Sequence, residues 1–146
     1  MNARPQRRRV SKAARERGEQ LLAAAKSNSL PRVQQVLHML GPGEGVDVGR
    51  DPIRAATPLF WAVDQDNAAM TTALLNAGAD VNATDNCNVT AAHHACYHDY
   101  QNALQALLAG QPNLNIRNNG GWLAMDDAVN QGNNTCAIML ARSHLM

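Results

Sequence analysis

Apolar and polar residues alternate along this chain with the period of short amphipathic helices. Within residues 67–77, apolar side chains recur every three or four positions, which predicts a helix, and Gly78 follows where a helix commonly ends. Residues 57–63 predict a second short helix, because Thr57 can cap its start and Pro58 stands where a missing N–H costs nothing. The pattern therefore predicts a pair of short helices joined by a tight turn.

The same helix pair recurs along the chain. Residues 20–28 and 31–40 predict an earlier pair, and two later pairs begin at Thr90 and near Leu123. Residues 41–45 are rich in glycine and lengthen one connection, which is an insertion that repeated units tolerate.

An internal repeat of 33 residues explains this recurrence. Ala62, Ala95 and Ala128 are spaced at that interval, and the tetrapeptide at 45–48 returns in related form at 78–81. Several independent landmarks keep the same phase, so we interpret the chain as an array of just under four units.

These residues resemble the ankyrin repeat. The resemblance rests on Thr57-Pro58-Leu59, on the phrase Gly-Ala-Asp-Val-Asn at 78–82 and on the period, and it extends over residues 19–146. It implies an all-α solenoid of stacked helix-turn-helix units with hairpin tips. We expect units at about 19–51, 52–84, 85–117 and 118–146, the first and last being degenerate, as terminal repeats commonly are.

The resemblance also implies a noncatalytic protein-protein interaction module without a cofactor, which binds a partner protein through its concave groove and hairpin tips. We expect the chain to be a monomer. The residues expected to face the groove are Lys26, Ser27, Asp64, Gln65, Tyr97, His98, Asn130 and Gln131. Those expected at the hairpin tips are Ile53, Arg54, Ala56, Asn86, Cys87, Val89, Asn119, Gly120 and Trp122.

Composition singles out two of these residues. Aromatic side chains make up only 3% of the chain, which argues against a sheet-based core. Tyr97 and Trp122 are thus conspicuous, and large aromatics dominate the binding energy of many interfaces. Trp122 has an alternative role as a lid over the weak last unit. Trp61 lies inside a predicted helix, where packing between units is expected.

A net charge of +1 conceals an asymmetry between two parts of the chain. Residues 1–17 have a net charge of +6, and the rest of the chain has −5. We interpret residues 1–18 as a basic, poorly ordered arm or a frayed lead into the first helix. The alternative function is an arm-led binder of nucleic acid or anionic surfaces through residues 4–17, with the repeats as a scaffold. Ser11 follows three arginines and is a candidate phosphorylation site.

A metal or catalytic site is a weaker hypothesis. His94 and His98 are four residues apart, a spacing that can hold zinc on a helix, with Cys87 and Cys96 as further ligands. No Cys-x-x-Cys pair accompanies them. His93 falls where the ankyrin pattern has a structural histidine that bonds to the backbone. We therefore expect no metal and no enzymatic activity.

The cysteines and the apolar runs bear on location. Three cysteines form no disulfide framework, and no apolar run is long enough for a membrane span or a signal-peptide core. Cys96 and Cys136 are expected in the core. We expect a reducing compartment, the cytoplasm or the nucleus.

Overall fold

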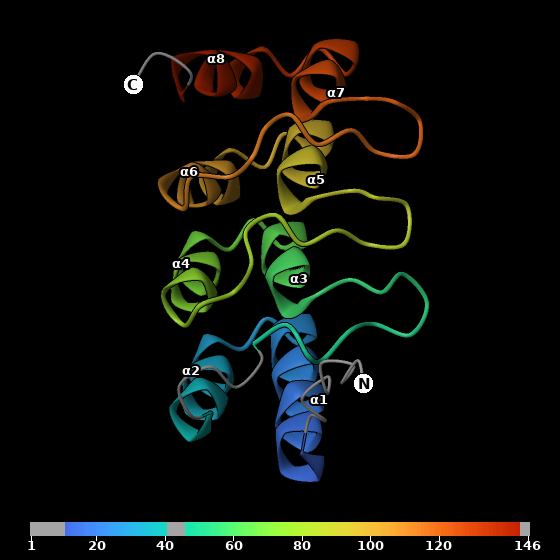
Figure 1. Ribbon diagram of the computed structural model, residues 1–146. Coiled ribbons are helices and arrows are strands. Elements are labelled where there is room, and N and C mark those ends of the chain that lie inside the picture. The colour runs from blue at the N-terminus through green and yellow to red at the C-terminus, as the bar shows by residue number, and fades with distance from the viewer. Residues whose placement is uncertain (1–10, 41–45, 144–146) are drawn as a thin grey trace, which may run out of the picture.

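The computed structural model describes residues 11–40 and 46–143, and these residues form eight helices arranged as four stacked pairs. The helices are α1 (Lys12–Lys26), α2 (Leu30–Met39), α3 (Pro58–Asp64), α4 (Ala68–Asn76), α5 (Ala91–His98), α6 (Gln101–Ala109), α7 (Ala124–Asn130) and α8 (Asn134–Ser143). Figure 1 shows the first helix of each pair in one column, the second helices in a parallel column, and the hairpin loops projecting on the opposite side. The all-α solenoid predicted from the sequence is confirmed.

Threonine caps set the start of the helices in the middle units. The Thr57 hydroxyl accepts a hydrogen bond from the Phe60 amide at the start of α3, and the Thr90 hydroxyl accepts one from the His93 amide at the start of α5. Each cap satisfies an amide that has no partner inside its helix. The recurrence of threonine at this interval therefore fixes where the two middle units turn into their first helices.

Helix α1 begins eight residues earlier than the sequence pattern predicts. Ser11 is its N-cap, and the Ser11 hydroxyl accepts a hydrogen bond from the Ala14 amide at 3.1 Å. Residues 12–18, assigned above to the arm, are therefore helical. Residues 1–10, which hold most of the predicted arm, lie outside the described residues.

Two small residues bring the N-terminal part of α1 against the chain that leads into the second unit. Gly18 is buried, and a Cβ atom added to it would lie 2.9 Å from the Gly49 backbone nitrogen. A larger residue at either position would force the helix and this segment apart. The approach holds the front of α1 in the array.

The core lies between the two helix columns and continues from unit to unit. Ala62, Ala95 and Ala128 are completely buried in the first helices, where their small side chains allow neighbouring helices to approach closely. Large apolar residues fill the space around them. The fully buried members are Leu21, Val33, Leu59, Val63, Met70, Leu74, Leu104, Leu107 and Leu140.

Backbone hydrogen bonds join the hairpin tips into a strip. The Asn86 amide donates to the Arg54 carbonyl at 2.9 Å, and the Asn119 amide donates to the Cys87 carbonyl at 3.0 Å. We call the row of three tips, at residues 51–56, 85–89 and 118–122, the tip strip. Because each tip is hydrogen-bonded to the next, the backbone that carries the tip side chains is held in place.

A left-handed residue closes the turn between the two helices of a unit. Asp66, Asp99 and Gly132 occupy this position with φ values of 48°, 61° and 72°. Asp66 also reaches into the next unit, where its Oδ1 atom accepts a hydrogen bond from the Ala103 amide at 2.9 Å. The N-cap of α6, Tyr100, makes no side-chain cap bond, so Asp66 caps the helix of its neighbour.

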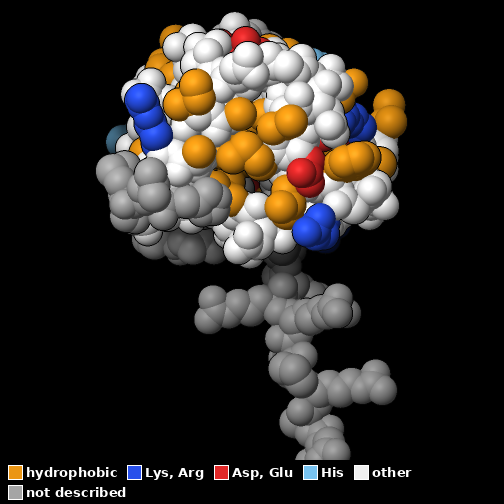
Figure 2. Space-filling model, turned by 90° about the horizontal axis from the view of Figure 1, so that it is seen from above, with side chains coloured by type: hydrophobic (Ala, Val, Ile, Leu, Met, Phe, Trp, Pro, Cys, Tyr) orange, Lys and Arg blue, Asp and Glu red, His pale blue; other side chains and the backbone are white. Residues whose placement is uncertain are grey.

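The last unit presents an apolar face at the end of the stack. Val129 on α7 is 62% exposed, whereas Val63 and Cys96, which precede it by two units and one unit, are completely buried by the following helix. Ile138 on α8 is also exposed. Figure 2 looks onto this end and shows apolar side chains gathered across it.

Candidate functional site

The groove beside the tip strip contains a hollow of about 470 Å³ formed by the third and fourth units. Its walls come from α5, α7 and the adjoining tips, so its shape depends on how these units stack. The lining residues are Arg54, Val89, His93, His94, Tyr97, His98, Asn118, Trp122, Asp127, Asn130 and Gln131. We call this space the groove hollow.

His94 lies at the back of the groove hollow and is tied to the preceding unit. Its Nε2 atom lies 2.6 Å from Asp64 Oδ1, at the end of α3. Burial lowers the pKa of His94 below its ordinary value of 6.5, although the Asp64 carboxylate opposes the shift. The neutral ring, with its hydrogen on Nε2, therefore donates to the carboxylate.

Aromatic rings surround this pair. The His94 ring lies 4.4 Å from the Phe60 ring and 4.5 Å from the His98 ring, measured between centroids. His98 in turn stacks on Tyr100 at 5.2 Å. The His98 ring therefore contacts both His94 and Tyr100, and the part of His98 that stays exposed lines the groove hollow.

His93 joins the third unit to the last tip. Its Nδ1 atom accepts a hydrogen bond from the Thr90 amide, so the Nε2 hydrogen points to the Trp122 carbonyl, 2.9 Å away. The expectation that His93 bonds to the backbone is confirmed. The Trp122 ring lies over its own tip, since a Cβ atom on Gly120 would lie 2.8 Å from it. The ring is nevertheless 48% exposed at the mouth of the groove hollow.

In the first two units the groove is occupied by internal contacts. The Lys26 ammonium lies 2.5 Å from Asp51 Oδ2 and 5.1 Å from the centroid of the Trp61 ring. The hydrogen bond from Lys26 holds the Asp51 pKa at about 2, below the usual 3.8. Trp61 packs between units, as expected. Lys26 is therefore engaged with this chain, although it is exposed enough to reach a partner.

Three more of the predicted contact residues also hold the array together. Arg54 pairs with Asp85 at 3.4 Å and covers the Phe60 ring at 4.8 Å. The Gln65 amide donates to the Lys26 carbonyl at 3.0 Å. The Asn86 amide group donates to the backbone carbonyl of residue 53 at 2.9 Å, within the tip strip.

Ten of the residues expected in the groove and at the tips are the principal candidates for partner contact: Lys26, Arg54, Asp64, Gln65, Asn86, Tyr97, His98, Trp122, Asn130 and Gln131. The structure brings six of these ten together, and Val89, also expected at a tip, lies with them. The six that line the groove hollow are Arg54, Tyr97, His98, Trp122, Asn130 and Gln131. Lys26, Asp64, Gln65 and Asn86 lie outside it. Ala56, expected at a tip, is only 1% exposed and therefore cannot meet a partner.

His94 and Asp127 also line the groove hollow, although neither was expected to face the groove. The sequence pattern marked His94 only as a candidate metal ligand and did not single out Asp127. Trp61, His94 and Asp127 are spaced by 33 residues, the period of the array. That spacing was the available signal, because residues one period apart occupy equivalent positions in successive units.

The two cysteines in the core have none of the features of a reactive thiol. Cys96 and Cys136 are completely buried, as expected, and burial raises the pKa of both thiols, that of Cys136 to about 12. Over residues 11–40 and 46–143, no group of three or more His, Cys, Asp or Glu side chains is arranged to hold a metal ion. Both thiols therefore stay protonated at neutral pH.

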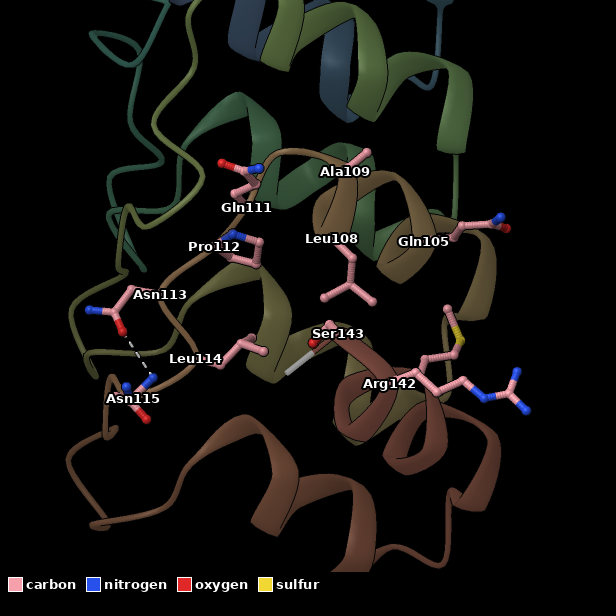
Figure 3. A pocket seen from close by; sticks show the side chains of 11 residues that line it. Gln105, Leu108, Ala109, Gln111, Pro112, Asn113, Leu114, Asn115, Arg142 and Ser143 are labelled. Carbon is pink, nitrogen blue, oxygen red and sulfur yellow. Dashed lines mark hydrogen bonds between the residues drawn. The ribbon is translucent and has the colours of Figure 1, made fainter. Parts of the chain in front are cut away.

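A second and larger hollow, of about 890 Å³, lies on the side away from the tips. It is bordered by α6, the turn that follows it and α8. Figure 3 shows Leu108 and Leu114 pointing into the space from two of these elements. None of the residues proposed for partner contact lines it.

Stacked helix pairs, capping threonines and bonded tips define the chain as a helical repeat protein. Comparison with known families identifies the kind of repeat. The chain belongs to the ankyrin-repeat family: a model of three ankyrin repeats matches residues 21–118 and again 59–145. Ankyrin repeats generally mediate contacts between proteins and do not themselves catalyse reactions.

One curated relative shows the same architecture in its sequence. Over 123 residues, or 80% of its length, this chain is 36% identical to the B-cell lymphoma 3 protein homolog of Mus musculus. The match spans only 27% of the relative's length. Within the described part of the chain, no helix combines the length and the apolarity that crossing a bilayer requires.

Proposed function

We propose that the chain is a noncatalytic module that binds a partner protein through the groove hollow and the adjoining tips. The observation that carries the proposal is the convergence of six predicted contact residues on one hollow. Two of them, Tyr97 and Trp122, are about half exposed although they are large aromatics. Burying such rings against a partner gains much contact area at little entropic cost.

The test compares partner capture by three versions of the full chain. We expect the wild-type protein to retain a partner that Tyr97→Ala/Trp122→Ala loses, because both rings leave the groove hollow. Met39→Ala is the matched control, since Met39 on α2 is similarly exposed but lies outside the hollow. Capture that survives the double variant, with folding verified by thermal melting, would exclude the groove as the binding site.

The basic arm provides the alternative mode of binding, and the start of α1 sharpens its test. Removing residues 1–10 takes away four arginines and leaves Ser11 and α1 intact, whereas removing 1–17 would cut into the helix. Binding that depends on the arm should weaken steeply with salt and disappear on truncation. Binding through the groove should survive the truncation and weaken far less steeply with salt.

We extend this proposal to the compartment and to the unit boundaries. The module is expected to act in the cytoplasm or the nucleus as a monomer, with units near 19–51, 52–84, 85–117 and 118–146. Ser11 remains a proposed phosphorylation site. Phosphate there would place negative charge at the start of a 15-residue helix, which its dipole favours.

A further inference from the structure

Pairs of side chains cross the groove from one unit to the next in a regular series. In the first step, Lys26 at the end of α1 lies over the Trp61 ring on α3. In the second, Asp64 at the end of α3 bonds His94 on α5. We call each such pair a rung. Both rungs join the end of one first helix to the middle of the next.

The third rung is built from Tyr97 and Asp127. Tyr97 stands one period after Asp64, and Asp127 stands one period after His94. Helix α5 packs against α7 as α3 packs against α5, so the two residues occupy the places that the earlier rungs use. Both line the groove hollow.

The third rung lacks the interaction that completes the other two. Within the part of the chain that the structure describes, the Asp127 carboxylate has no hydrogen bond or ion pair, whereas its neighbour Asp126 accepts one from the Leu123 amide at 2.8 Å. Asp127 is only partly exposed, and burial raises its pKa. The Tyr97 ring is 49% exposed. The Tyr97 ring meets the His98 ring at 5.0 Å between centroids, yet about half of the residue stays exposed. The position thus combines a carboxylate that has no hydrogen bond with a half-exposed aromatic ring.

Such a combination matches a cation. Carboxylates form charge-assisted hydrogen bonds with ammonium and guanidinium groups, and aromatic faces attract the same groups. Arg54 also lines the groove hollow, but its guanidinium pairs with Asp85 and covers the Phe60 ring. Outside the first 17 residues the chain has a net charge of −5, which favours the approach of a basic partner.

We propose that the third rung receives a lysine or arginine side chain from a basic segment of the partner protein, with the cation between the Tyr97 ring and the Asp127 carboxylate. The proposal rests on the proposed function and adds the chemistry of the partner. The Trp122 ring, at the mouth of the same hollow, covers the apolar stem of the incoming side chain.

A titration with synthetic peptides tests the rung. The probes are a peptide of Gly-Ser-Lys repeated three times, its arginine counterpart and its glutamine counterpart, followed through the Trp122 indole and Tyr97 ring signals by NMR. We expect the two cationic peptides to shift these signals and the glutamine peptide to leave them unchanged. Equal shifts with the glutamine peptide would overturn the proposal.

Two variants separate this site from general charge attraction. Asp127→Asn should weaken binding of the lysine peptide about tenfold, while Glu19→Gln, which removes the same charge from an exposed site on α1, should leave it unchanged. Because the Asp127 carboxylate has no hydrogen bond, Asp127→Asn should change the melting temperature only slightly, through the lost interaction with the dipole at the start of α7. A large loss of stability would show that Asp127 already has a partner within the chain and would contradict the proposal.

The captured partner distinguishes failure of the rung from failure of the proposed function. If Tyr97→Ala/Trp122→Ala loses the partner and Asp127→Asn keeps it with unchanged affinity, the groove binds a protein but the rung does not bind a cation. If the wild-type chain instead pairs with itself, and removing residues 1–10 abolishes the doubled mass, the cation comes from another copy's arm. That result would overturn the assignment to a separate partner.

Discussion

His94 is the residue at which burial and charge oppose each other most directly. Its ring is 7% exposed and in contact with aromatic rings, which disfavours the protonated form, while Asp64 at 2.6 Å favours it. Burial prevails, so the pKa lies below the ordinary value. Since the unfolded chain then binds the proton more readily, His94 lowers the stability of the fold as the pH falls below about 6.5.

Removing the negative charge of Asp64 should lower the pKa of His94 further. We expect Asp64→Asn to lower the pKa of His94 below its wild-type value, because the contribution that raises it is lost and the burial remains. The variant should also lose more stability than the wild-type protein between pH 6.5 and pH 5. An NMR titration of the His94 ring measures the first effect and melting curves measure the second. An unchanged or higher His94 pKa would refute this account of the pair.

Single residues also show where prediction from sequence stops. The Thr57 and Thr90 caps and the buried alanines follow from position in the repeat, because equivalent positions recur every 33 residues. The contact between Asp64 and His94 does not, since it depends on which way two side chains turn after the units have stacked. Knowing that Asp64 faces the groove was therefore insufficient to predict its partner.

At the level of helices, each unit depends on the one before it. Tyr100 makes no cap bond for α6, and the Asp66 carboxylate of the preceding unit bonds the Ala103 amide instead. Asp66 also adopts the left-handed conformation, which aspartate and asparagine tolerate better than alanine. One side chain thus closes the turn of its own unit and starts a helix of the next.

Substitution of this residue separates the two roles. We expect Asp66→Ala to destabilise the fold by about 1–3 kcal/mol, because the cap is lost and alanine is strained at positive φ. Asp66→Asn is the control: it keeps an oxygen acceptor and tolerates the conformation, so it should cost less than about 1 kcal/mol. Urea unfolding measures both. Equal losses in the two variants would mean that the Ala103 bond contributes nothing.

The start of α1 could not be predicted from its sequence pattern. The apolar period becomes regular only from Leu21, and the preceding positive charges favour disorder. The structure adds the Ser11 cap and the contact of Gly18 with Gly49, which bury one side of this early part. A contact with a distant segment thus extends the helix, and such contacts leave no periodic trace in sequence.

For the whole molecule, burial depends on neighbours in the stack. Val63 and Val129 occupy the same position in their units, yet the first is completely buried and the second is 62% exposed. The difference arises only because α5 covers α3 while none of the described elements covers this face of α7. An array of this kind gains stability from its interfaces as well as from each unit.

The two valines provide a matched pair for testing this view. Val63→Lys should destabilise the fold by about 4 kcal/mol or more, because it buries an unpaired charge between units. Val129→Lys should change stability by less than about 0.5 kcal/mol, because the lysine remains in water. Thermal melting of the full chain distinguishes them. A comparable loss with Val129→Lys would show that this face is covered in solution.

The tip strip has a mechanical consequence. Its backbone bonds, from Asn86 to Arg54 and from Asn119 to Cys87, fix the spacing of successive tips along one edge of the molecule. The column of second helices is tied between units through side chains instead, as where the Ala103 amide donates to the Asp66 carboxylate. Because side chains turn more easily than backbone, we expect the array to bend rather than stretch. Flexing therefore changes the curvature of the groove while the tips keep their spacing.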